Sequence, residues 1–242
     1  MRLFHGTNEQ AARSAAGDGL LTRSALEIES NWDMPSREDL VYLTRGYAPY
    51  FAANASDAGS KWGLVEVEVD PGDLLPDEDF MEQATRGYDW TETIAANPPA
   101  RGEFEVLLQM RGMVDRTRWF RERLSWFRHM AEASLEGLGN CAHEWDIDGA
   151  DVVRVAVFDP KALGTLSMTA MDPTITIINW VICGEKYQAL NRWMLGYDVT
   201  AEEVFATPAV HGMERSPVQM EALADLNEKM ASHAGVEVIY ER

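Results

Sequence analysis

The segment Leu64–Asp70 constrains the fold more than any other part of the chain, because it alternates apolar and acidic side chains along its length. A period of two is typical of a β-strand that buries one face and exposes the other. Pro71 and Gly72 follow directly and end the segment. The chain is therefore expected to contain a sheet. Further strands are predicted at Leu3–Phe4, Val41–Thr44, Asn140–His143, Val152–Phe158 and Val236–Tyr240.

Helical segments lie between these predicted strands. Asn8 can cap a helix that extends through Ala16. Shorter helices are expected at Tyr50–Ala58 and Glu185–Leu195, while the type of Phe104–Met110 stays open. The mixture of separate strands and helices predicts an α+β fold.

One long amphipathic helix is predicted to begin at Asp115. Its apolar residues recur at spacings of three and four, which is the period of a helix with one buried face. Gly137 and Gly139 stop it. The apolar positions are Phe120, Leu124, Phe127, Ala131, Leu135 and Leu138.

The charge balance limits the partners that the chain can bind. The 40 acidic residues outnumber the 21 basic ones, which gives a formal net charge of -19. Such a surface repels phosphate backbones, so tight non-specific binding to nucleic acid is not expected. The long helix is locally basic, and its arginines either offer a place for an anionic partner or pair with surrounding acids. These arginines are Arg116, Arg118, Arg121, Arg123 and Arg128, interleaved with Trp119 and Trp126.

The remaining composition indicates a cytoplasmic protein without a membrane partner. No segment approaches the roughly 20 apolar residues that span a bilayer. The N-terminus lacks the basic and apolar regions of a signal peptide. Only Cys141 and Cys183 occur, so neither a disulfide framework nor a metal site is expected.

Two short segments in the first fifty residues are the strongest candidates for a binding site. A predicted strand runs into His5-Gly6-Thr7, and a second one carries Tyr42. A histidine at a strand end, a glycine that permits close approach of a ligand, and a nearby tyrosine are suited to hold a flat aromatic base.

This succession resembles the start of the ADP-ribosyltransferase superfamily of the His-Tyr-Glu type, which includes poly(ADP-ribose) polymerases and is related to tRNA 2'-phosphotransferases. The resemblance covers roughly the first seventy residues and, more loosely, Asn140–Phe158. It implies a split antiparallel β-sandwich around an NAD cleft, with helical insertions. On this basis we expect a core over residues 1–160 and a C-terminal extension over residues 161–242 that packs on it.

The resemblance also implies roles for individual residues, with NAD as the substrate. His5 would hydrogen-bond the adenosine ribose with support from Thr7, and the Gly6 backbone would pair with the nicotinamide carboxamide. Tyr42, or else Tyr50, would stack on the nicotinamide ring. The other residues expected at the NAD site are Thr44, Arg45 and Phe51.

The catalytic acid of the family has no single counterpart in this chain. The strand that would carry it begins at Asn140, and the acids near it are Glu136 and Glu144. A second possibility is Glu103 or Glu105, in a segment similar to a strand of arginine-specific family members. A third is the run Asp77-Glu78-Asp79, in which neighbouring charges raise at least one pKa unless the run is simply an exposed helix start.

The resemblance predicts transfer of ADP-ribose from NAD to a macromolecular acceptor, with release of nicotinamide. The acceptor class, protein or nucleic acid, stays open. Alternatives on the same fold are an NAD glycohydrolase, a 2'-phosphotransferase, and a non-catalytic acidic binding protein. The composition suits a bacterial or phage protein.

Overall fold

The computed structural model describes the chain apart from residues 31–34, 85–100, 164–185, 201–202, 204–223 and 226. The chain divides into two compact units that alternate along the sequence. The first unit holds residues 1–21, 44–69 and 147–242, and the second holds residues 22–43 and 70–146. The boundary predicted at residue 160 lies within the first unit. The described elements combine helices with antiparallel strands, which confirms the α+β class.

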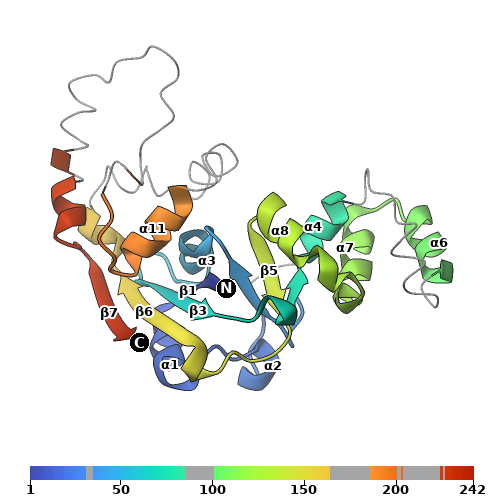
Figure 1. The fold of residues 1–242 in the computed structure, drawn as a ribbon, viewed down its shortest axis with the longest axis horizontal. Helices are drawn as coiled ribbons and strands as arrows, with labels where there is room; N and C mark the ends of the chain where they lie inside the picture. Colours follow the sequence, from blue (N-terminus) through green and yellow to red (C-terminus); the bar gives the residue numbers. More distant parts are fainter. Residues whose placement is uncertain (31–34, 85–100, 164–185, 201–202, 204–223, 226) are drawn as a thin grey trace, which may run out of the picture. The chain divides into compact units, whose positions relative to one another are not determined.

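The first unit is built on an antiparallel sheet. Strand β1 (Arg2–Asn8) pairs with β3 (Trp62–Glu68), and β3 pairs with β6 (Val152–Phe158). The last strand, β7 (Val236–Glu241), lies beside β6 (Figure 1). The strands predicted at these places are therefore confirmed.

The alternation that predicted β3 holds only in part. Val65 is buried and Glu68 is exposed, as a period of two requires. Glu66, however, is only 4% exposed. Its carboxylate accepts a hydrogen bond of 2.6 Å from the Tyr197 hydroxyl and pairs with Arg2 at 3.6 Å. Both faces of β3 are thus covered along most of its length.

Three helices of the first unit have predicted counterparts. Helix α1 (Glu9–Asp18) begins where Asn8 caps it, because the Asn8 side chain accepts a 2.9 Å hydrogen bond from the amide of Ala11. Helices α3 (Ala48–Asn54) and α11 (Lys186–Met194) follow. Single 3₁₀ turns are at Gly149–Asp151 and Pro160–Leu163. The core includes Phe4, Leu64, Phe158, Leu190, Trp193 and Met194.

The second unit is mainly helical. Strand β4 (Leu74–Pro76) pairs with β5 (Asn140–His143), and β5 neighbours β2 (Val41–Thr44), whose last residue belongs to the first unit. Its helical segments are α2 (Arg23–Leu26), Pro71–Asp73, α4 (Glu78–Ala84), α6 (Arg101–Gln109), α7 (Met113–Arg121), η3 (Leu124–Met130) and α8 (Ala131–Gly137).

The long helix predicted from Asp115 is wrong as a single element. It is divided into α7, the 3₁₀ segment η3 and α8, and Phe127 has a non-helical backbone with φ of -112° and ψ of 18°. The break lets Phe120, Leu124 and Phe127 all bury completely in one core. Spacings of three and four persist through 3₁₀ turns, so the periodicity alone does not reveal the breaks.

Two other segments depart from expectation. Phe104–Met110 lies mostly within α6, so the strand suggested by its likeness to arginine-specific family members is wrong. Helix α3 begins two residues before the predicted Tyr50 and ends at Asn54.

No helix among the described residues is both long enough and apolar enough to cross a membrane. Within the predicted C-terminal extension, residues 164–185 and 204–223 lie outside the described residues.

Candidate functional site

A hydrogen bond joins two predicted site residues within the second unit. The Tyr42 hydroxyl, on β2, donates to Glu78 Oε2 at 2.8 Å. Glu78 is the first residue of α4 and is 5% exposed, whereas Tyr42 is half-buried. The backbone amide of Arg37 donates to the same hydroxyl at 3.2 Å. The two hydrogen bonds therefore fix the orientation of the phenol.

Glu78 belongs to an acidic cluster at the start of α4, formed by Asp77, Glu78, Asp79 and Glu82. Asp77 and Glu82 are buried like Glu78, and Asp79 is exposed. The alternative that the run Asp77–Asp79 is a simple solvated helix start is therefore wrong for Asp77 and Glu78 and holds for Asp79.

Two arginines on α7 face the buried acids. Arg121 Nε lies 3.3 Å from Glu78 Oε1, and Arg116 Nε lies 3.6 Å from Glu82 Oε1. The two arginines are five residues apart on α7, and their partners are four residues apart on α4. Two ion pairs therefore join α4 to α7. Both pairs are largely shielded from water, which strengthens them relative to surface ion pairs.

Asp77 connects the cluster to the rest of the second unit. Its backbone amide donates to Ser134 Oγ at 3.0 Å, and the Ser134 hydroxyl donates to the carbonyl of Asn140 at 2.7 Å. Its carboxylate accepts the amide of Asp79 at 2.8 Å, which caps the first turn of α4. The acids are thus held by α8 and β5 as well as by α7.

Burial changes the protonation of this cluster. It raises the pKa of Asp77 to about 7, with smaller contributions from the neighbouring charges of Glu78 and Asp79. Burial also raises the pKa of Glu78, while the hydrogen bond from Tyr42 and the charge of Arg121 act in the opposite direction. The pKa of Tyr42 is raised well above its ordinary value, mainly by burial and then by Glu78. One proton can therefore be exchanged here near neutral pH.

The residues His5, Gly6 and Thr7 lie on β1 in the first unit. His5 and Thr7 are half-buried. A side chain at position 6 is impossible, because a Cβ there would be 1.9 Å from the backbone oxygen of Ala48. The packing of α3 on β1 therefore accounts for the glycine without any ligand.

The remaining predicted NAD-binding residues are also in the first unit. Thr44 is buried, and its hydroxyl accepts the amides of Gly46 at 3.2 Å and Tyr47 at 2.9 Å, so it stabilises the turn before α3. The rings of Tyr50 and Phe51 meet edge to face with centroids 5.4 Å apart. Arg45 is half-buried.

Four other candidate acids are exposed or paired with arginines. Glu136 is exposed on α8, and Glu105 is exposed on α6. Glu144 pairs with Arg128, and Glu103 pairs with Arg123. Glu78 is therefore the predicted acid that the structure joins to a predicted ring.

The basic segment has mostly internal partners. Arg116, Arg121, Arg123 and Arg128 each pair with an acid of the second unit. The Arg123 guanidinium also lies 4.8 Å from the ring centre of Trp119, which is only 5% exposed. These contacts favour the interpretation that the arginines of this segment pair with surrounding acids. They do not favour an open surface for an anionic partner.

A surface hollow of about 550 Å³ lies elsewhere, on α1. It is lined by Glu9, Gln10, Arg13 and Ser14, and Arg13 pairs with Glu9 and Glu237. His5, Tyr42 and the other residues named above for the NAD site are not in its lining. The described residues contain no group of three or more side chains suited to hold a metal ion.

The sequence indicated Arg121 only as one of five arginines of the basic segment and did not connect it with Glu78. Acids one turn apart in α4 and arginines on α7 are a possible sign of such pairing. The sequence shows the pairing only if the two helices are already known to be neighbours. No protein-family model, no curated protein and no solved structure matches this chain.

Proposed function

We propose that the protein is an NAD-dependent ADP-ribosyltransferase that modifies a macromolecular acceptor and releases nicotinamide, on a split antiparallel β-sandwich of the ADP-ribosyltransferase type. The observation that carries the proposal is the 2.8 Å hydrogen bond between Tyr42 and Glu78. The two residues are 36 positions apart and were expected at the site for separate reasons, one as a stacking ring and one as an acid.

In the proposed reaction, the bond between nicotinamide and ribose breaks first. Nicotinamide leaves with the bonding electrons, and the ribose carbon develops oxocarbenium character. The acceptor then bonds to that carbon and loses a proton. The ionised Glu78 carboxylate supplies negative charge for the oxocarbenium, and the Asp77–Glu78 pair takes the acceptor's proton before releasing it to water.

The proposed role of Tyr42 combines two contacts. Its ring stacks on the electron-poor nicotinamide, and its hydroxyl stays hydrogen-bonded to the Glu78 carboxylate. The direct hydrogen bond between the predicted ring and a buried carboxylate supports this assignment.

The first unit contributes the remaining groups in this proposal. His5 and Thr7 bind the adenosine ribose, and Arg45 provides positive charge for the pyrophosphate. Variants in each unit test these roles separately.

A labelling experiment tests the proposal. Pure protein is incubated with NAD labelled in the adenosine part, with and without cell lysate, and the products are separated. Label that moves onto lysate macromolecules supports the transferase, free ADP-ribose alone indicates a glycohydrolase, and unchanged NAD indicates a binding protein. RNA carrying a 2'-phosphate, added with NAD, detects the phosphotransferase.

Three variants give this experiment its controls. His5→Ala and Glu78→Gln should each abolish label transfer. Glu136→Gln, which removes an exposed acid of the same unit, should keep it. Transfer that persists in Glu78→Gln but is lost in Glu136→Gln would reassign the catalytic acid.

A further inference from the structure

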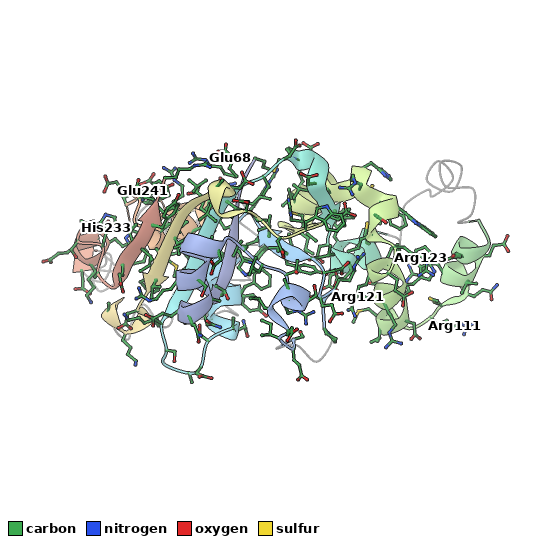
Figure 2. All side chains as sticks on the ribbon, turned by 90° about the horizontal axis from the view of Figure 1, so that it is seen from below. Glu68, Arg111, Arg121, Arg123, His233 and Glu241 are labelled. Carbon is green, nitrogen blue, oxygen red and sulfur yellow. The ribbon has the colours of Figure 1, made fainter. Side chains whose placement is uncertain are left out.

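The Glu78 carboxylate is held by partners from two different elements. Oε2 accepts the Tyr42 hydroxyl at 2.8 Å, and Oε1 faces Arg121 Nε at 3.3 Å. Each oxygen thus has its own partner, which restricts rotation of the carboxylate. Arg121 extends from the end of α7 and is labelled in Figure 2.

We propose that Arg121 is a positioning residue, which holds the Glu78 carboxylate ionised and turned toward Tyr42. The catalytic consequence rests on the proposed NAD chemistry. The effect of Arg121 on the Glu78 carboxylate does not depend on that chemistry and can be measured without NAD.

The electrostatic surroundings of Glu78 explain why it needs a cation. Asp77 and Asp79 flank it in sequence, and Glu82 lies one turn further along α4. Of the elements packed against α4, α8 contributes the uncharged Ser134 hydroxyl, and α7 contributes the two arginines. Arg121 is the cation paired with Glu78, and its charge lowers the pKa of that carboxyl against the effect of burial. Removing the guanidinium leaves the carboxylate buried among like charges, so it retains its proton to higher pH.

Arg116 provides a matched control on the same helix. Its side chain is 16% exposed against 17% for Arg121, and both pair with buried acids of α4. Arg116 pairs with Glu82, which is not the residue bonded to Tyr42. A merely structural role for these ion pairs would therefore give the two arginines similar effects.

The test uses the full chain with Arg121→Gln, Arg121→Lys and Arg116→Gln. Glutamate carboxyl carbons are labelled with ¹³C, Glu78→Gln assigns the Glu78 resonance, and each variant is titrated by NMR. The Glu78 resonance should titrate about one pH unit higher in Arg121→Gln than in wild type. In Arg121→Lys, the Glu78 resonance should titrate close to its wild-type pH, because lysine keeps the positive charge. In Arg116→Gln, it should titrate at the wild-type pH.

The catalytic part is measured as the pH profile of nicotinamide release. Arg121→Gln should lower the rate at pH 7 by roughly 10- to 100-fold, move the acid limb upward, and be partly rescued by Arg121→Lys. Equal NMR titrations in Arg121→Gln and wild type would overturn the inference. If Arg121→Gln does not fold, Arg121→Met, which keeps the length of the side chain without its charge, replaces it, and an unchanged Glu78 titration in that variant would overturn the inference equally. A shifted NMR titration in a protein that never consumes NAD would instead refute the proposed function and keep the positioning role.

Discussion

Both units bury charged side chains, but they balance these charges differently. In the first unit, Glu66 on β3 and Arg154 on β6 are register partners, and both are more than nine-tenths buried. Arg154 pairs with Glu241, and its guanidinium lies 4.0 Å from the ring centre of Tyr197. Arg2 pairs with the Glu66 carboxylate, and the Tyr197 hydroxyl donates a hydrogen bond to it. Positive and negative groups thus alternate across the sheet.

In the second unit, the acids are in excess. Four acids in the cluster face two paired arginines, and the pKa values of Asp77 and Glu78 are raised. The buried charges of the first unit thus link neighbouring strands, while the surplus acids of the second unit include carboxyls that hold their protons to higher pH. Four predictions, each with a control variant, break or sharpen this contrast.

The largest effect is expected from Arg154→Ala in the first unit. The change removes the ion-pair partner of Glu241 and the cation at the register position opposite buried Glu66. Removing one member of a buried ion pair typically costs about 3–5 kcal/mol of unfolding free energy. Urea unfolding measures this, and Arg13→Ala, which breaks exposed ion pairs on α1, is the control. If the urea midpoint shifted as little in Arg154→Ala as in Arg13→Ala, the buried charges around Arg154 would not stabilise the sheet.

The next effect separates the two buried glutamates by function. Glu78→Gln should slow nicotinamide release by roughly 10²–10³-fold, since it removes the charge proposed to stabilise the oxocarbenium. Glu66→Gln, at similar burial in the first unit, should lower stability and leave the rate per folded molecule within about threefold. Equal rate losses in both variants would erase the proposed distinction.

The third prediction concerns pH. An unfolded aspartate has a pKa near 3.8, and that of buried Asp77 is about 7. Between these values the folded protein binds more protons than the unfolded chain, so the unfolding free energy should fall as pH rises from about 4 to 7. At about 1.4 kcal/mol per pKa unit, the decrease is on the order of 2–4 kcal/mol. Chemical unfolding across this range should show it, and Asp77→Asn should flatten the curve.

Asp39 offers a control of opposite sign in the same unit. The hydrogen bond from Arg37 lowers the pKa of Asp39, so its contribution is present above pH 4 and lost on acidification. Asp39→Asn should therefore leave the decrease between pH 4 and 7 unchanged. The same decrease in Asp77→Asn as in wild type would assign the titration to another group.

The smallest effect is expected from Tyr197→Phe. This change removes the 2.6 Å hydrogen bond to Glu66 and keeps the ring beside Arg154. The expected loss is about 1–2 kcal/mol of unfolding free energy, with nicotinamide release unaffected. Tyr42→Phe should show the reverse, with a clear loss of activity. A larger activity loss in Tyr197→Phe would contradict the assignment of chemistry to the second unit.

Local features of the fold were predictable from the sequence. Asn8 caps α1 through its own side chain, and Val152–Phe158 forms a strand at the predicted residues. These elements depend on neighbouring residues alone. The break at Phe127 depends on how three large side chains enter one core, which periodicity does not encode.

The candidate site was predictable only as separate pieces. Tyr42 and Glu78 were singled out individually, but their hydrogen bond joins residues 36 positions apart. Gly6 was interpreted as a ligand contact, while the close approach of Ala48 gives it a structural reason. The burial of Asp77 depends on α8, through Ser134, and no local pattern around the acids indicates it.

NMR of the full chain with NAD tests the central claim most directly. In Glu78→Gln, which should bind NAD without cleaving it, saturating NAD is expected to give nuclear Overhauser contacts between the nicotinamide protons and the Tyr42 ring, and to shift the His5 imidazole resonances. Unchanged His5 and Tyr42 resonances at saturating NAD would contradict the account.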